Sequence, residues 1–159
     1  MIELRNSTLL FLIKRSQGQV EEICLAMKKR GFGVGRWNGV GGKVEVGESI
    51  ESAVKRETRE EIGVNAKEID KVAELTFYFP HNPSWNQLVH VYFCEVWEGD
   101  PVETEEMSPK WVAVPEIPFN QMWADDIFWL PEVLKGGFVK ASFTFDEHDL
   151  ILDQDIQVT

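Results

Sequence analysis

Hydrophobic residues in this chain gather in short runs that are rich in β-branched and aromatic side chains, and residues that favour turns separate the runs. Runs of this length and composition are typical of β-strands. They predict strands at 8–14, 20–27, 72–79, 88–97 and 111–114, and a final pair at 138–145 and 150–158. Strands are therefore expected to dominate the middle of the chain.

A different pattern covers residues 49–62, where apolar side chains recur at helical spacing. Ser49 is suited to cap the N-terminus of this helix, and Gly63 stands where a left-handed glycine would end it. A second, shorter helix is predicted at about 127–135. The chain is thus expected to combine a sheet with two helices.

The size and composition of the chain indicate one folded domain, residues 1–159. A hydrophobic fraction of 43% excludes collagen-like and disordered chains. No apolar stretch approaches the roughly 18 residues of a membrane span, and the N-terminal segment lacks the basic start of an export signal. We therefore expect a cytoplasmic protein with no membrane partner. Cys24 and Cys94, both inside apolar runs, fit this expectation as reduced core residues.

A formal net charge of −11 argues against binding to nucleic acid, because the phosphate backbone would be repelled. The charge is unevenly placed, however, since residues 23–44 contain no Asp or Glu. That segment carries five cations, which are Lys28, Lys29, Arg30, Arg36 and Lys43. It could therefore accept a small anionic ligand. The three histidines lie far apart in the sequence and do not predict a zinc site.

Carboxylates occupy part of the first predicted helix where apolar residues would be expected. At helical spacing Ile50, Val54, Glu57 and Glu61 share one stripe, and Glu60 flanks it. Because an unpaired carboxylate is costly to place against an apolar layer, a cation is expected beside this cluster. A solvated acidic helix face remains the alternative.

The identity of that cation follows from the neighbouring residues. Arg56 and Arg59 are expected to lie on the other side of the helix, although Arg56 could reach Glu60, so a divalent cation with oxygen ligands suits the cluster better. The preceding segment, 31–43, is rich in glycine and free of acids, so its backbone amides could bind phosphate oxygens. Its glycines could equally serve hairpin turns. Taken together, the two features indicate a divalent metal that joins phosphate oxygens to the protein.

Residues 42–64 resemble the Nudix box, which is a glycine, five residues, a glutamate, seven residues, and then Arg-Glu-x-x-Glu-Glu-x-Gly and an aliphatic residue. Thr58 departs from the family, which usually has a bulky aliphatic residue there, and this concerns helix packing rather than chemistry. The similarity to the MutT-type oxidised-purine nucleoside triphosphatases also includes the segments 27–33, 35–39, 101–103, 106–107, 117–119 and 122–126.

The resemblance implies an α/β Nudix fold, an α/β/α sandwich around a mixed β-sheet. It implies a hydrolase that uses Mg²⁺, or Mn²⁺, to convert nucleoside triphosphates such as 8-oxo-dGTP and 2-oxo-dATP to the monophosphate and pyrophosphate. The members that the chain most resembles are largely monomeric, act on small-molecule nucleotides, and cleanse the nucleotide pool. The metal ligands it implies are Gly41, through its carbonyl, and Glu57, Glu60, Glu61 and Glu106.

The resemblance also assigns roles around this metal. Arg56 would orient the glutamates, Glu48 would join the loop to the helix or help a second metal, and Glu61 is favoured as the base that accepts a proton from water. The implied substrate-binding residues are Thr8, Lys28, Phe32, Asn38, Gly42, Lys43, Phe77, Phe79, Met107, Trp123, Asp125 and Asp126.

Some alternatives stay open. Asp125 and Asp126 could cap the second helix instead of reading a purine base, for which one carboxyl would hold a proton. The same box could serve a Nudix pyrophosphatase for another nucleoside diphosphate derivative. A nucleotide-sensing module without activity is disfavoured, because its usual sign would be a broken glutamate cluster.

Overall fold

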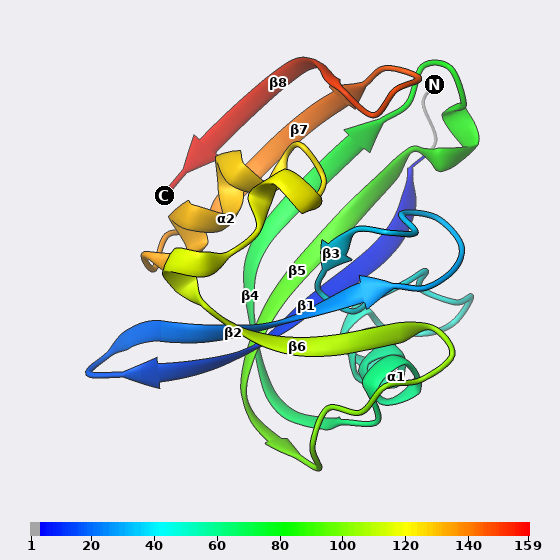
Figure 1. The fold of residues 1–159 in the computed structure, drawn as a ribbon. Coiled ribbons are helices and arrows are strands. Elements are labelled where there is room, and N and C mark those ends of the chain that lie inside the picture. Colours follow the sequence, from blue (N-terminus) through cyan, green and yellow to red (C-terminus); the bar gives the residue numbers. More distant parts are fainter. Residues whose placement is uncertain (1–3) are drawn as a thin grey trace.

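The computed structural model describes residues 4–159 and forms a single curved sheet with a helix on each side (Figure 1). The helices are α1 (Ile50–Ile62) and α2 (Asp126–Leu134). The strands are β1 (Arg5–Ser16), β2 (Gln19–Lys28), β3 (Trp37–Asn38), β4 (Asn65–Tyr78), β5 (Gln87–Glu98), β6 (Met107–Ala113), β7 (Val139–Phe145) and β8 (Ile151–Val158). Three short 3₁₀ turns, η1 (Pro83–Trp85), η2 (Val114–Glu116) and η3 (Phe119–Gln121), lie in the connections.

The sheet is mixed. Its strand order is β3-β2-β1-β5-β4-β7-β8, and β6 pairs with β2 outside this path. The pairs β1–β5 and β4–β7 are parallel, whereas the other pairs are antiparallel. The parallel register places Arg5 opposite Gln87 and Leu12 opposite Cys94. Residues that are more than 80 positions apart in the sequence therefore become neighbours.

Two apolar cores lie on opposite faces of the sheet, because successive side chains of a strand point to opposite sides. Phe11 and Ile13 of β1 belong to one core, which Trp129 of α2 completes. Leu10 and Leu12 belong to the other core, together with apolar residues of α1. The predicted α/β/α sandwich is therefore confirmed, with α2 and α1 as its outer layers (Figure 1).

Every predicted strand is present, and β1, β4 and β6 extend well beyond the residues that the sequence pattern indicated. β1 covers residues 5–16 rather than 8–14. β4 begins at residue 65 rather than 72, because its polar first half is held by pairing with β5. β6 begins at residue 107 rather than 111, and it tolerates Pro109 because β6 lies at an edge of the sheet. The two-residue strand β3 is too short to leave a periodic pattern.

The predicted ends of α1 are confirmed. The Ser49 hydroxyl accepts a hydrogen bond from the Ser52 amide at 3.1 Å, and Gly63 has a left-handed φ of 71°. Helix α2 begins at Asp126, one residue earlier than predicted, and Asp125 at its N-cap position makes no side-chain capping hydrogen bond. The capping interpretation of these two aspartates is therefore wrong.

Two further expectations concern the cysteines and the membrane. Cys24 and Cys94 are buried and free, as expected of core thiols. Within residues 4–159, no helix is both long enough and apolar enough to cross a membrane.

Candidate active site

The glycine-rich loop between β2 and α1 lies directly on strand β1. The Leu10 and Val40 backbones exchange two hydrogen bonds, at 2.7 and 2.9 Å, and the Thr8 amide donates to the Gly42 carbonyl at 2.9 Å. A Cβ atom at Gly41 would lie 1.8 Å from the Thr8 carbonyl oxygen, so only glycine permits this approach. The loop is therefore fixed against β1 by backbone hydrogen bonds and forms part of the site, so its glycines do more than form a hairpin turn.

This approach places a buried carboxylate beside the loop. Glu61 is only 3% exposed, and its Oε1 accepts a hydrogen bond from the Gly41 amide at 2.7 Å. Burial raises the pKa of Glu61 to about 7, although the Lys28 charge opposes the effect. Burial also raises the pKa of Glu57, against the influence of Arg56. Glu57 and Glu61 thus lie against the protein, whereas Glu60 is exposed.

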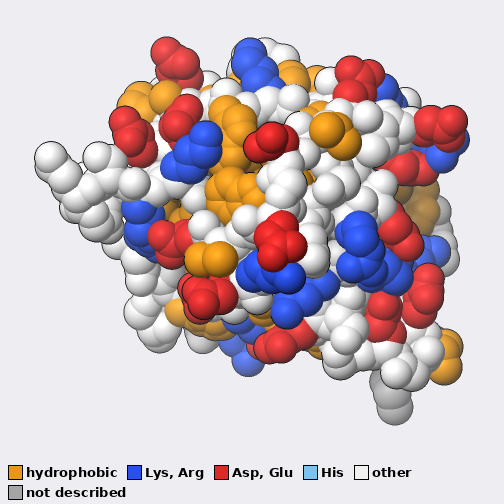
Figure 2. Space-filling view, turned by 90° about the horizontal axis from the view of Figure 1, so that it is seen from below, with side chains coloured by type: hydrophobic (Ala, Val, Ile, Leu, Met, Phe, Trp, Pro, Cys, Tyr) orange, Lys and Arg blue, Asp and Glu red, His pale blue; other side chains and the backbone are white. Residues whose placement is uncertain are grey.

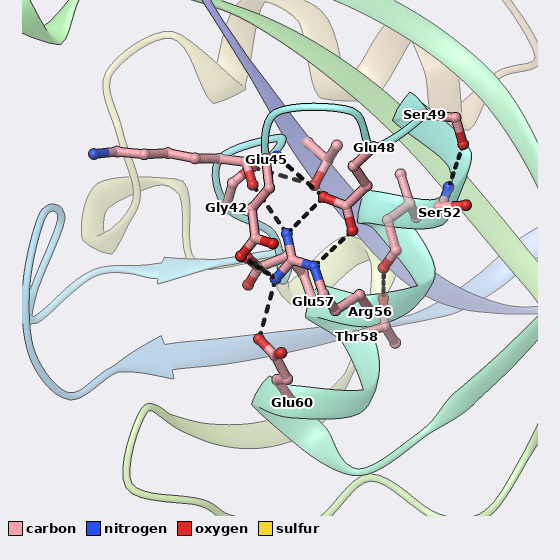
Figure 3. A network of polar contacts seen from close by, with 12 residues as sticks. Gly42, Glu45, Glu48, Ser49, Ser52, Arg56, Glu57, Thr58 and Glu60 are labelled. Atoms are coloured by element: carbon pink, nitrogen blue, oxygen red, sulfur yellow. Dashed lines mark hydrogen bonds and ion pairs between the residues drawn. The ribbon is translucent and has the colours of Figure 1, made fainter.

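Arg56 holds this cluster together (Figure 3). Its Nε and Nη2 donate to the two oxygens of Glu48 at 2.7 and 2.9 Å, and its Nη1 donates to Glu57 at 2.9 Å and to Glu60 at 3.2 Å. Hydrogen bonding from Arg56 lowers the pKa of Glu48 to about 2. The prediction that Arg56 lies on the other side of the helix from the acids is wrong, because its guanidinium bonds to Glu57 as well as to Glu48 in the loop. Its predicted reach to Glu60 is confirmed.

The donor set suits a hard divalent cation. Glu57, Glu60 and Glu61 each have one carboxylate oxygen engaged by Arg56 or Gly41, and the other oxygen accepts no hydrogen bond from any described residue. Carboxylate oxygens are the ligands that Mg²⁺ prefers. In the described residues, no three acidic, His or Cys side chains converge closely enough to surround an ion. The acids are therefore suited to the metal in chemistry, with Glu57 and Glu60 held by Arg56 and Glu61 held by the Gly41 amide.

Glu106 lies apart from the other glutamates in its contacts. Its Oε1 accepts a hydrogen bond from Arg30 Nε at 2.9 Å, which lowers its pKa. The charge of Glu106 nevertheless helps to raise the pKa of Glu61, so the two carboxylates interact electrostatically. Its role as an additional metal ligand stays a prediction.

A cavity of about 270 Å³ opens next to the glutamate cluster. The structure brings all the predicted substrate-binding residues to its wall, although they come from seven separate segments of the chain. They are Thr8, Lys28, Phe32, Asn38, Gly42, Lys43, Phe77, Phe79, Met107, Trp123, Asp125 and Asp126. Gly41 also lines the cavity, whereas Arg56, Glu57, Glu60, Glu61 and Glu106 lie beyond the lining.

The polar end of this cavity is a pair of buried aspartates. Asp125 and Asp126 are 2% and 3% exposed, and Trp129 Nε1 donates a hydrogen bond to Asp125 at 2.7 Å. Asp126 Oδ2 is buried without a partner among the described residues. Burial raises the pKa of Asp125 to about 6, and burial together with the neighbouring Asp125 charge also raises the pKa of Asp126. Burial therefore favours a proton on the pair, and with that proton the pair offers both a donor and acceptors.

The cavity also includes residues that the sequence analysis missed. Arg5 and Gln87 line it from facing positions on β1 and β5, and Gln87 is only 8% exposed. Trp129 and Phe145 close its apolar side. Arg5 could have been found from the alternation of side chains along β1, because it lies on the same face of the strand as Phe11. Gln87 could not, because only the pairing of β1 with β5 brings it to the cavity.

The basic segment is largely neutralised by acidic neighbours. Lys29 bonds to Glu103, and Arg30 and Arg36 also pair with acids. Figure 2 shows such mixtures of basic and acidic side chains on one face of the molecule. Of the five cations, Lys28 and Lys43 line the cavity.

Comparisons with known proteins agree with this geometry. Residues 3–133 match the model of the NUDIX domain. The chain is 43% identical over 135 residues to an oxidized purine nucleoside triphosphate hydrolase of Danio rerio, covering 85% of this chain and 86% of the relative. It is 41% identical over 139 residues to the protein of the same name in Mus musculus, covering 87% and 88%.

A solved structure shows the same fold. The MutT protein from Bacillus halodurans superposes with a TM-score of 0.83 at 22% sequence identity, covering 97% of this chain and 98% of that one. The predicted Nudix fold is confirmed. Because the domain model matches most of the chain and both relatives match along most of their length, this protein belongs to the Nudix family.

Proposed function

We propose that this protein hydrolyses oxidised purine nucleoside triphosphates, such as 8-oxo-dGTP and 2-oxo-dATP, to the nucleoside monophosphate and pyrophosphate. The observation that carries the proposal is the buried pair Asp125 and Asp126, which lines an aromatic cavity beside an intact Nudix glutamate cluster. The two relatives with more than 40% identity bear the name of this activity.

The aspartate pair supplies a reason for base selection. Oxidation at C8 of guanine converts N7 from an acceptor into an N–H donor, so an oxidised base and an unmodified base present different edges. A carboxyl pair that shares a proton can accept one hydrogen bond from the base and donate another. A site of this kind penalises a base that leaves one of its buried polar groups unpaired. The aromatic walls, which include Phe32 and Trp123, would contact the faces of the base.

The glutamate cluster supplies the hydrolytic chemistry. A bound Mg²⁺, or Mn²⁺ in its place, would neutralise phosphate charge and lower the pKa of a bound water. Glu57, Glu60 and Glu61 would hold the ion with Glu106 and the Gly41 carbonyl, and Arg56 would keep the carboxylates oriented through Glu48 and Glu57. Lys28 and Lys43 reach the cavity wall and would face the triphosphate. Glu61, whose burial raises its pKa to about 7, is suited to accept the proton of the attacking water.

We also propose a cytoplasmic setting in which one domain, 1–159, acts as a monomer. The net charge of −11 supports a small-molecule substrate rather than nucleic acid. The local cations Lys28 and Lys43 offset that charge at the cavity.

The experiment is a comparison of pyrophosphate release from 8-oxo-dGTP, 2-oxo-dATP and unmodified dGTP in the presence of Mg²⁺. We expect the oxidised nucleotides to turn over far faster, and Asp126→Asn to reduce that preference while dGTP hydrolysis changes little. Equal, slow turnover of all three by folded protein would refute the proposal and favour another nucleoside diphosphate derivative. No turnover of any nucleotide would favour a sensing module.

A further inference from the structure

Trp123 forms one wall of the base cavity, and the turn at residues 31–36 packs against it. Its ring stacks on Phe32 with 5.2 Å between ring centroids and an angle of 25° between the planes. A Cβ atom at Gly33 would lie 3.2 Å from Trp123 Nε1, which shows how closely the turn approaches. The guanidinium carbon of Arg36 lies 4.2 Å from the centroid of the Trp123 ring.

Arg36 does not line the base cavity. Arg36 and Asp149 line a separate, more open hollow on the other side of the aromatic wall. Trp123 and Phe32 line both this hollow and the base cavity. Any effect of Arg36 on a bound base would therefore pass through Trp123. A guanidinium suits this position because its plane can stack on a ring while its N–H groups pair with a carboxylate.

That carboxylate comes from the distant β7–β8 hairpin. Arg36 Nη2 donates to Asp149 Oδ2 at 2.7 Å, and both side chains are about one-third exposed or less. Partial burial makes such a pair stronger than one in open solvent. The ion pair thus joins two loops that flank Trp123.

Hydrogen bonds within the turn hold the hairpin end of the pair. Asp146 Oδ1 accepts hydrogen bonds from the His148 and Leu150 amides at 2.7 and 3.0 Å, and Asp149 has a positive φ of 60°. Phe145, which precedes this turn, packs against Trp123 with 5.6 Å between centroids. Asp149 is therefore presented to Arg36 from a fixed position.

We propose that Arg36 and Asp149 are positioning residues for the purine base. Their ion pair holds the Arg36 guanidinium over the Trp123 ring, so that Trp123, stacked on Phe32, keeps its position in the wall of the base cavity. The inference deepens the proposed function and rests on it. It concerns binding of the base rather than the phosphate chemistry, because neither residue contacts the glutamate cluster in the described part of the chain.

The test uses Arg36→Met, which retains length without charge, Asp149→Asn, which retains shape, and the double variant. We expect each single variant to raise KM for 8-oxo-dGTP about five- to twentyfold, with kcat within about twofold of wild type. The double variant should raise KM no more than Arg36→Met alone, because the pair acts as a unit. Arg36→Lys should fall between wild type and Arg36→Met.

Arg15→Met is the matched control, because Arg15, near the end of β1, pairs with Glu95 of β5 at 2.8 Å and does not line the base cavity. It should leave KM unchanged. An unchanged KM in the Arg36 and Asp149 variants, a lowered kcat at constant KM, or additive effects in the double variant would overturn the inference.

A binding measurement separates this inference from the proposed function. Calorimetry with 8-oxo-dGMP needs no turnover, and the dissociation constant should rise in Arg36→Met and Asp149→Asn by the same factor as KM. If wild type binds 8-oxo-dGMP but does not hydrolyse the triphosphate, the proposed function fails while the positioning role is decided by these constants. If wild type does not bind 8-oxo-dGMP, both are refuted.

Discussion

The buried carboxylate of Glu61 should destabilise the metal-free protein at neutral pH, and Glu61→Gln should remove that cost. Gln retains the shape of Glu and the oxygen that accepts the Gly41 amide hydrogen bond at 2.7 Å. It behaves like the protonated carboxyl group at every pH. The variant therefore isolates the free energy of ionising Glu61 in the folded protein.

The magnitude follows from the raised pKa. Burial shifts the pKa of Glu61 from 4.5 to about 7, so the folded protein binds the proton more tightly than the unfolded chain. The contribution of Glu61 to stability is then most favourable below pH 4.5 and is lost as the pH rises toward 7. By linkage the loss is about 3 kcal/mol at pH 7 and about 1 kcal/mol at pH 5. The larger value corresponds to about 9 °C in Tm for a chain of this size.

The assay is urea unfolding of wild type and Glu61→Gln with a metal chelator at pH 5 and pH 7. Glu60→Gln is the matched control, because the Glu60 side chain is 57% exposed and should change stability by less than about 0.5 kcal/mol. We expect Glu61→Gln to be more stable than wild type, with a gain that shrinks at pH 5, and to be nearly inactive with Mg²⁺. A variant that is less stable than wild type at pH 7, or a gain independent of pH, would refute the reasoning.

Three further predictions concern the supports of the site. Arg56→Lys loses the paired hydrogen bonds to Glu48, so kcat/KM should fall roughly 10- to 100-fold. In a metal titration, the Mg²⁺ concentration for half-maximal activity should rise, and an unchanged metal dependence would contradict the orienting role. Gly41→Ala would bring Cβ within 1.8 Å of the Thr8 carbonyl oxygen and should lower the free energy of unfolding in urea by at least about 2 kcal/mol. A variant as stable as wild type would show that the loop can shift freely. Trp129→Phe removes the 2.7 Å hydrogen bond to buried Asp125, so the free energy of unfolding should fall by about 1–3 kcal/mol. The preference for oxidised purines should also weaken, and a substrate screen that finds this preference intact would exclude Trp129 from base recognition.

The sequence alone determined the elements whose signals are local. Ser49, Gly63 and the spacing of apolar residues defined α1, because capping and helical periodicity act within a few residues. The same spacing placed Glu57 and Glu61 on one face of that helix. The Nudix box and the flanking segments then named twelve residues that all line one cavity.

Only the tertiary structure decided how distant residues meet. Arg56 turned toward the acids because Glu48 approaches it from the loop. Gln87 entered the cavity because β5 pairs in parallel with β1, and Asp149 reached Arg36 across 113 positions through the β7–β8 hairpin. The sequence was compatible with both a capping and a base-binding role for Asp125 and Asp126, and only the structure showed that Asp125 makes no capping hydrogen bond. These features depend on strand pairing and burial, which are long-range properties of the packed chain and leave no local periodicity to be read.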